Sequence, residues 1–188
     1  MKWGVVLTLA RQFAARHILQ VLYYRPSTWP KIQMDGDSIP LPEVVIRHFR
    51  SAASIVSIVA SVPLEVVSET FEDRSEYHQL VLSRITSRHL SPGIVFLDPD
   101  TGLQPRKATL EHVLDSEARD IWSKLVSGDV LVLYQHQTNR NGQDWVSPKT
   151  QQFERAIGIQ HGEAKIAQSP DIARDVAFFY ARKGTAGK

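Results

Sequence analysis

The chain of 188 residues is 43% apolar and 22% charged, which is typical of one globular domain over residues 1–188 and excludes a largely disordered chain. It contains no cysteine, which excludes disulfides, thiolate metal sites and cysteine nucleophiles and favours a cytoplasmic location. Its formal net charge of +2 gives no support to nucleic-acid binding, which depends on many clustered lysines and arginines.

The first predicted element is a helix. An apolar run from Trp3 to Ala10 ends at Arg11, so it is too short to cross a bilayer, and no small-residue cleavage site follows it. The helical spacing continues through Phe13 and Ala14 to His17. We therefore expect an amphipathic helix packed on the domain in preference to a secretion signal, and no association with a membrane.

Strands and helices alternate through the rest of the chain. A β-branched and aromatic run at 18–24 predicts a strand, and the prolines and Asp-Gly pair within 26–42 predict a long irregular loop. The run at 93–97 is apolar throughout, which is typical of a strand covered on both faces. Further helices are expected over 44–49, 72–85, 110–126 and 148–157, further strands over 55–59, 64–68, 129–134, 164–167 and 176–181, and a loose tail from 183.

This order of elements predicts the fold class. We expect a three-layer α/β domain with a mainly parallel, Rossmann-like sheet flanked by helices and an antiparallel strand pair at its C-terminal edge. In such sheets, ligands bind beyond the carboxyl ends of the strands. The segments that follow predicted strands, and so become candidates for a site, are 24–25, 68–69, 98–102 and 135–138.

The most informative of these segments is 98–102. Asp98 and Asp100 flank Pro99, which fixes one backbone angle, and Gly102 permits a turn that other residues resist. Carboxylates at a strand end can accept a proton, hold a cation or bind a ligand amine or hydroxyl. A turn in which both acids cap the backbone is the alternative. We predict catalytic roles for the two acids and substrate contacts from Pro99, Thr101 and Gly102.

The strand that ends in Tyr134-Gln135-His136 adds a second group of candidates. His136 could act as a general base, a metal ligand or a donor to a carboxylate, whereas most single histidines are structural. Tyr134 and Gln135 are expected to contact the substrate. Glu69 and Arg25 are weaker binding candidates, because acids and arginines at strand ends are often only solvated. His78 and Arg140 are more often surface residues.

Several familiar motifs are missing. The first strand is not followed by GxGxxG, and the chain contains no Walker loop, no HExxH and no GxSxG. The sequence therefore assigns no cofactor from a motif. Asp98, Asp100 and His136 are the residues that could hold a divalent metal if one binds.

Two motifs resemble a family of uncharacterised bacterial proteins. The chain reads FLDPDTGL over 96–103 and VLYQH over 132–136, close to that family's F-L/F-D-P-D-N/T-G-L/I and V-Y-Q-H patterns. The resemblance is firm over 72–137, and the element order there resembles the second half of a class I methyltransferase. Short proteins of this kind also occur on mobile elements such as integron cassettes, which suggests a similar origin.

The methyltransferase resemblance implies a site layout. Asp98-Pro99 would lie where those enzymes hold the amine that is methylated, and S-adenosylmethionine would lie over the first two strands. The chain departs from that pattern at both strands. Tyr24-Arg25 stand where glycines would let the backbone approach the cofactor, and Ala60-Ser61 follow the strand predicted at 55–59, where an acid would hold the ribose.

Three functions remain open at this stage. The first is a methyltransferase-like enzyme acting on a small-molecule or nucleotide-like substrate, in which Asp98 and Asp100 orient the substrate and His136 moves a proton. The second is a ligand- or protein-binding module with a degenerate fold, for which Trp29 and Trp145 are candidate exposed aromatic contacts. The third is a metal-dependent phosphoesterase or nuclease. The sequence does not indicate the oligomeric state.

Overall fold

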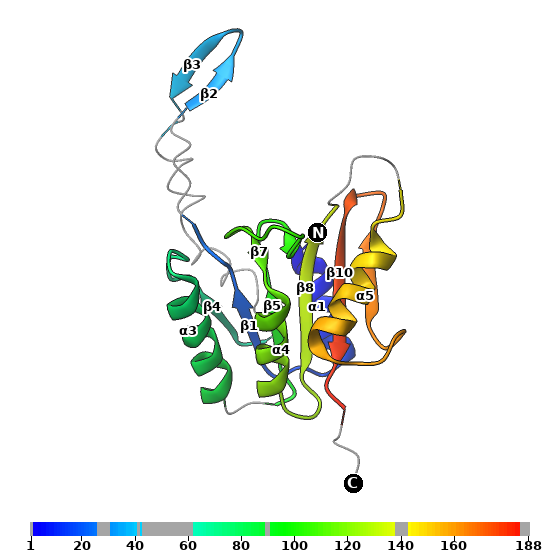
Figure 1. Ribbon diagram of the computed structural model, residues 1–188. Coiled ribbons are helices and arrows are strands. Elements are labelled where there is room, and N and C mark those ends of the chain that lie inside the picture. The colour runs from blue at the N-terminus through cyan, green and yellow to red at the C-terminus, as the bar shows by residue number, and fades with distance from the viewer. Residues whose placement is uncertain are drawn as a thin grey trace.

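The computed structural model describes residues 2–25, 31–40, 42, 62–88, 91–137 and 143–184, and its centre is a six-stranded sheet (Figure 1). The strands, in their spatial order, are β4 (Leu64–Val67), β1 (Ile18–Val21), β5 (Ile94–Leu97), β8 (Val130–His136), β10 (Ala173–Arg182) and β9 (Lys165–Ser169). The first four run parallel, and β10 is antiparallel to both of its neighbours. The predicted α/β fold with an antiparallel pair at the C-terminal edge is confirmed.

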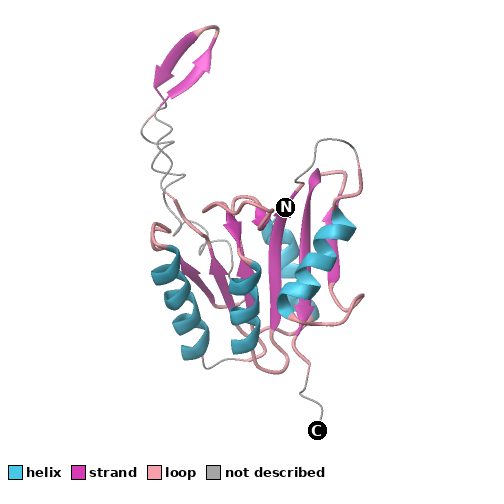
Figure 2. Cartoon of the chain, viewed as in Figure 1, coloured by secondary structure: helices cyan, strands magenta, loops and turns pink. Residues whose placement is uncertain are grey.

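Helices cover both faces of the sheet (Figure 2). Three of them, α3 (Arg74–Ser87), α4 (Asp115–Lys124) and α5 (Val146–Ile157), lie on one face, and α1 (Lys2–Gln12) lies on the other. Among the described residues, no helix combines the length and apolar character needed to cross a membrane.

Local chemistry sets the ends of these helices. Asp73 caps α3 by accepting a hydrogen bond from the backbone N–H of Glu76 at 2.9 Å. The helix α5 ends at Gly158, whose φ of 72° is the left-handed conformation that glycine adopts without strain.

The strand β5 divides the core into two parts. Val95 and Leu97 pack in the cluster under α3, α4 and α5, and Ile94 and Phe96 pack in the cluster under α1. All four side chains are fully buried, as the apolar run predicted. Because side chains alternate along a strand, the residue after Leu97 is directed to the α1 face. That residue is Asp98.

Two predicted elements differ from the structure. The expected irregular loop contains an antiparallel hairpin of β2 (Lys31–Met34) and β3 (Asp37–Pro40). Its turn residues, Asp35 and Gly36, have φ angles of 54° and 92°, which suit a two-residue hairpin turn. The helix expected from residue 110 begins at Asp115, because β7 (His112–Val113) first pairs with β6 (Gly102–Leu103).

Other predictions fall outside the described residues or are corrected. The helix at 44–49, the strand at 55–59, Trp29, Arg140 and the end of the tail lie outside them. Trp145 was expected to be exposed, but it is buried where α5 begins and belongs to the core under α3, α4 and α5.

Candidate functional site

The Asp98 carboxylate lies at the carboxyl end of β5 and is almost completely buried. Its backbone N–H donates to the Val21 carbonyl at 2.9 Å, which continues the pairing of β1 with β5 by one residue. One carboxylate oxygen accepts a hydrogen bond from the Lys2 ammonium at 2.6 Å, and the other accepts one from the Gln20 amide at 2.9 Å. Burial raises the Asp98 pKa, although Lys2 and Gln20 both act to lower it.

Gln20 is the polar neighbour of Asp98 on β1. The residue is 1% exposed, and its Nε2 donates to the carboxylate. The Oε1 atom is buried and has no hydrogen-bond partner in the described part of the chain. A buried acceptor without a donor typically costs about 1–3 kcal/mol. The Gln20 amide that contacts Asp98 therefore also carries a buried acceptor that is unsatisfied among the described residues.

Tyr134 completes the surroundings of the Lys2 ammonium. The Lys2 Nζ lies 4.0 Å from the centroid of the Tyr134 ring, which is a favourable cation–π distance. Burial and the charges of Asp98 and Asp175 raise the pKa of Tyr134 to about 12, so its hydroxyl stays neutral near neutral pH. Tyr134 therefore contributes an uncharged aromatic ring whose face contacts the Lys2 ammonium.

His136 lies at the rim of the same face. Its ring meets Tyr134 edge-on at 5.1 Å between centroids, and its Nδ1 is 3.5 Å from an Asp175 carboxylate oxygen. The His136 side chain is 39% exposed, so solvent reaches it. Asp98 and His136 thus lie on the same side of the sheet, with Lys2 and Tyr134 between them. The Asp98 carboxylate is paired with Lys2, and the His136 imidazole is paired with Asp175.

Gln135 points to the opposite face and holds the 98–102 bend in place. Its Oε1 accepts from the Leu103 N–H at 2.8 Å, and its Nε2 donates to the carbonyls of Thr101 and His136 at 3.2 and 2.7 Å. Gly102 lies against this amide with a φ of 131°, and any Cβ there would overlap it. These contacts give Gln135, Thr101 and Gly102 a positioning role, whereas the sequence suggested substrate contacts.

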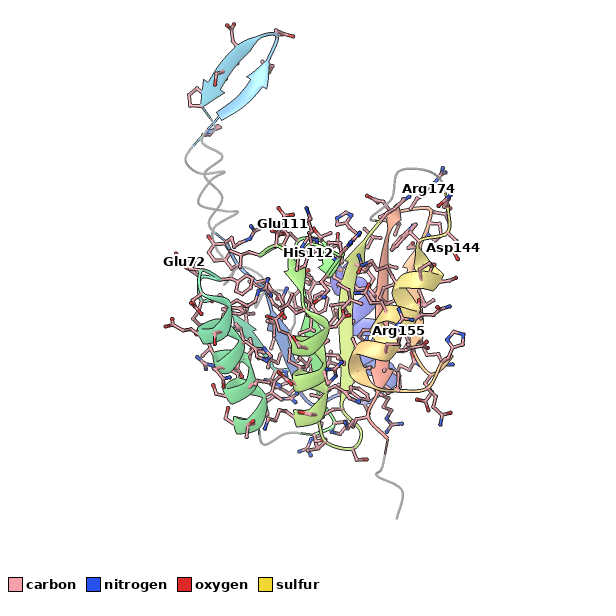
Figure 3. All side chains as sticks on the ribbon, viewed as in Figure 1. Glu72, Glu111, His112, Asp144, Arg155 and Arg174 are labelled. Carbon is pink, nitrogen blue, oxygen red and sulfur yellow. The ribbon has the colours of Figure 1, made fainter. Side chains whose placement is uncertain are left out.

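Asp100 and Arg25 form a separate cluster at the strand ends. Asp100 is ion-paired with Arg25, and the Arg25 guanidinium also lies 3.7 Å from Glu111, which Figure 3 shows at the carboxyl edge of the sheet. Asp100 is exposed, whereas Pro99 is buried between the two acids. The two carboxylates of the motif therefore have different partners and do not share one site.

The described residues do not bring metal ligands together. Within the part of the chain that the structure describes, no group of three or more histidine, aspartate or glutamate side chains could hold a metal ion. The expected set of Asp98, Asp100 and His136 is divided among Lys2, Arg25 and Asp175. This arrangement does not fit a divalent-metal centre.

An acid follows the strand beside β1. In the sheet that neighbour is β4, and Ser68-Glu69 follow it. The strand predicted at 55–59 and the Ala60-Ser61 pair after it lie outside the described residues. Glu69 is exposed and lies 3.2 Å from Arg84, whereas Asp98 is paired with Lys2.

The end of β1 is closed by aromatic side chains. The Tyr23 N–H donates to the Tyr77 hydroxyl at 3.2 Å, and the Phe71 N–H donates to the Tyr24 carbonyl at 2.7 Å. The Tyr23 ring packs edge-on against Phe71 at 5.3 Å between centroids. Because these backbone groups are used and the local side chains are large, the end of β1 does not fit S-adenosylmethionine in the position that the methyltransferase resemblance implies.

Sequence reasoning missed the two residues that contact the Asp98 carboxylate. Gln20 had a local signal, because it is the one polar residue in the run at 18–24 apart from the tyrosines. Lys2 had none, since it meets Asp98 only when α1 packs on the sheet.

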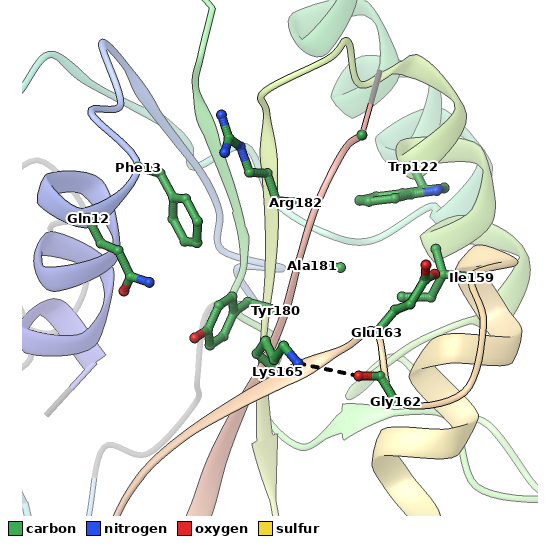
Figure 4. Close-up of a pocket in the computed structure, with 11 residues that line it drawn as sticks. Gln12, Phe13, Trp122, Ile159, Gly162, Glu163, Lys165, Tyr180, Ala181 and Arg182 are labelled. Carbon is green, nitrogen blue, oxygen red and sulfur yellow. Dashed lines mark hydrogen bonds between the residues drawn. The ribbon is translucent and has the colours of Figure 1, made fainter. Parts of the chain in front are cut away.

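A separate cavity of about 640 Å³ lies at the other end of the strands (Figure 4). It surrounds the edge of β10 beyond the start of β9, with Phe13 and Tyr180 on one side of the strand and Trp122 and Ile159 on the other. None of the residues predicted for function lines it. The cavity is therefore distinct from the Asp98 region.

Comparisons of the chain with protein-family models, curated proteins and solved structures found no significant match. The functional assignment therefore rests on the chemistry of the residues described above.

Proposed function

We propose that this protein is a small-molecule-binding module with a degenerate Rossmann-like fold, and that it recognises a ligand carrying N–H donors at Asp98. The observation that carries the proposal is the buried Asp98 carboxylate beside Gln20 Oε1, an acceptor without a partner among the described residues. A buried carboxylate and a free amide oxygen are both acceptors. They favour a cationic ligand or one rich in donors over an anion.

The position of these groups also supports the proposal. Asp98 and Gln20 lie at the carboxyl ends of neighbouring parallel strands, where ligands bind in α/β sheets. The supports of the bend are rigid, because the Gln135 amide is fully hydrogen-bonded behind it. The bend that carries Asp98 is therefore already ordered, which reduces the ordering cost of binding.

Three matched probes test this proposal: benzamidine, benzamide and benzoate, which share one ring and differ in charge. We expect millimolar benzamidine to shift the NMR amide signals of Asp98, Thr101 and His136 more than benzamide does, and benzoate to leave them in place. Asp98→Asn should abolish the shifts, whereas Asp100→Asn should keep them, because Asp100 faces Arg25. Equal shifts in wild type and Asp98→Asn, or none with any probe, would contradict the proposal.

A second candidate is the methyltransferase-like enzyme acting on a small-molecule or nucleotide-like substrate. The observation in its favour is Glu69, an acid after the strand that neighbours β1. Against it stand the aromatic side chains at the end of β1, so the cofactor would need another position. Calorimetric titration with S-adenosylmethionine separates the two candidates. Heat that disappears in Glu69→Gln would favour the enzyme, and no heat at millimolar cofactor would eliminate it.

A further inference from the structure

The Lys2 side chain already occupies the Asp98 region. Its ammonium nitrogen lies 2.6 Å from an Asp98 oxygen and 4.0 Å from the centre of the Tyr134 ring. Chemically, this side chain is an n-butylammonium group tethered to the first turn of α1. The contacts of Lys2 therefore show how a primary alkylammonium fits between the Asp98 carboxylate and the Tyr134 ring.

The groups around the ammonium are more deeply buried than the ammonium's own side chain. The side chain of Lys2 is 41% exposed, against 7% for Asp98. A buried carboxylate requires a compensating cation, since an unpaired charge in the interior is strongly unfavourable. Helix ends also open more easily than helix centres, because their first backbone groups lack intrahelical partners. Asp98, Gln20 and Tyr134 are thus the fixed part of the site, and Lys2 is the residue that is most easily displaced from it.

An ammonium group has three N–H donors, and Lys2 directs one of them to Asp98. The amide of Gln20 that donates to Asp98 also carries Oε1, a buried acceptor without a partner in the described part of the chain. A free ligand, which is not tied to α1, can orient its ammonium toward both acceptors. When the ammonium of a ligand replaces that of Lys2, Asp98 keeps a cationic partner. The partly exposed Lys2 side chain then becomes solvated.

We propose that Asp98, Gln20 and Tyr134 form a subsite for the primary alkylammonium group of a small molecule, and that Lys2 occupies this subsite until the ligand displaces it. This inference rests on the proposed function and adds the ligand class and a built-in competitor. Primary ammonium ions are preferred over quaternary ones, because only the former can donate hydrogen bonds to Asp98 and Gln20.

The test is calorimetric titration of n-butylammonium chloride into wild-type protein and into Lys2→Met. Methionine keeps a linear side chain on α1 but removes the cation. We expect Lys2→Met to bind n-butylammonium at least about tenfold more tightly than wild type. Lys2→Arg keeps a cation at the site and should bind as weakly as wild type. Tetramethylammonium should bind Lys2→Met more weakly than n-butylammonium.

Two measurements keep the test independent of folding defects. n-Butylammonium should raise the melting temperature of Lys2→Met, because a ligand that binds the folded state stabilises it, and it should not raise that of Lys2→Met with Asp98→Asn. In wild type, saturating n-butylammonium should move the NMR signal of the Lys2 Cε to that of a solvated lysine. A Lys2 signal that does not move, or equal affinity of wild type and Lys2→Met, would overturn the inference.

The outcomes also separate this inference from the proposed function. Asp98-dependent binding of benzamidine without binding of n-butylammonium would refute the alkylammonium class and leave the ligand site in place. Failure of both probes would remove the site itself.

Discussion

Replacement of Gly102 by alanine should destabilise the protein strongly, because Gly102 supports the bend that carries Asp98. Gly102 has a φ of 131°, which alanine adopts only with strain. A Cβ at this position would lie 2.5 Å from Gln135 Nε2 and closer still to Oε1. The Gln135 amide cannot move aside freely, since it holds Leu103, Thr101 and His136 by hydrogen bonds.

The expected loss combines two effects. Backbone strain at a position reserved for glycine costs about 1–3 kcal/mol. Displacement of the Gln135 amide leaves the buried Leu103 N–H unsatisfied, which costs about 1–3 kcal/mol more. We therefore expect Gly102→Ala to lower the free energy of unfolding by about 3–5 kcal/mol and the melting temperature by about 10 °C. Urea unfolding followed by tryptophan fluorescence measures this change, because Trp122 and Trp145 are buried.

Gly162→Ala is the matched control. Gly162 has a φ of 88°, but a Cβ added there would have no atom within 4 Å, so strain alone should cost about 1 kcal/mol. The double variant Gly102→Ala with Gln135→Ala should lose less than the sum of the single losses, since the overlapping amide is gone. A Gly102→Ala loss no larger than that of Gly162→Ala, or full additivity with Gln135→Ala, would refute the assigned contact.

Three other perturbations have defined outcomes. Asp129→Asn removes the charge that pairs with buried Arg88 at 3.3 Å and should lower the free energy of urea unfolding by about 3 kcal/mol; a change below about 1 kcal/mol would be inconsistent with that pair. Burial, and then the charge of Arg88, lower the pKa of His17 below 6.5, so the unfolded chain binds its proton more readily. The stability that neutral His17 contributes is therefore complete above pH 6.5 and is lost as the pH falls below it. In denaturant titrations repeated across this pH range, the free energy of unfolding of His17→Gln should decline less steeply with falling pH than that of wild type. Gly4→Ala adds a helix-favouring residue to α1 where its Cβ meets no atom within 4 Å, and it should raise the free energy of unfolding by about 0.5–1 kcal/mol; a lower melting temperature would contradict the helix there.

The central sheet could be predicted because burial leaves a strong pattern in the sequence. The uniformly apolar run at 94–97 required cover on both faces, and the change to Asp98-Pro99 marked its carboxyl end. The C-terminal pair β9 and β10 was recognised in the same way. The hairpin of β2 and β3 was also recognisable, since Asp35-Gly36 is a two-residue turn signal, but the surrounding prolines favoured a loop.

The site was predictable only in part. The strand-end rule placed Asp98 and Tyr134-Gln135-His136 near one edge of the sheet, and alternation along β8 explains why Gln135 faces away from its neighbours. The partners of Asp98 come from distant segments, and Lys2 is separated from it by 96 positions. A contact of that kind depends on how α1 packs across the sheet, for which the local sequence carries no signal.

The crystal structure of Lys2→Met grown with n-butylammonium chloride tests the ligand site most directly. We expect the ammonium nitrogen within hydrogen-bonding distance of the Asp98 carboxylate and of Gln20 Oε1, over the face of the Tyr134 ring. A hydrated Asp98 carboxylate with no bound cation, or the cation held elsewhere on the protein, would contradict the assignment.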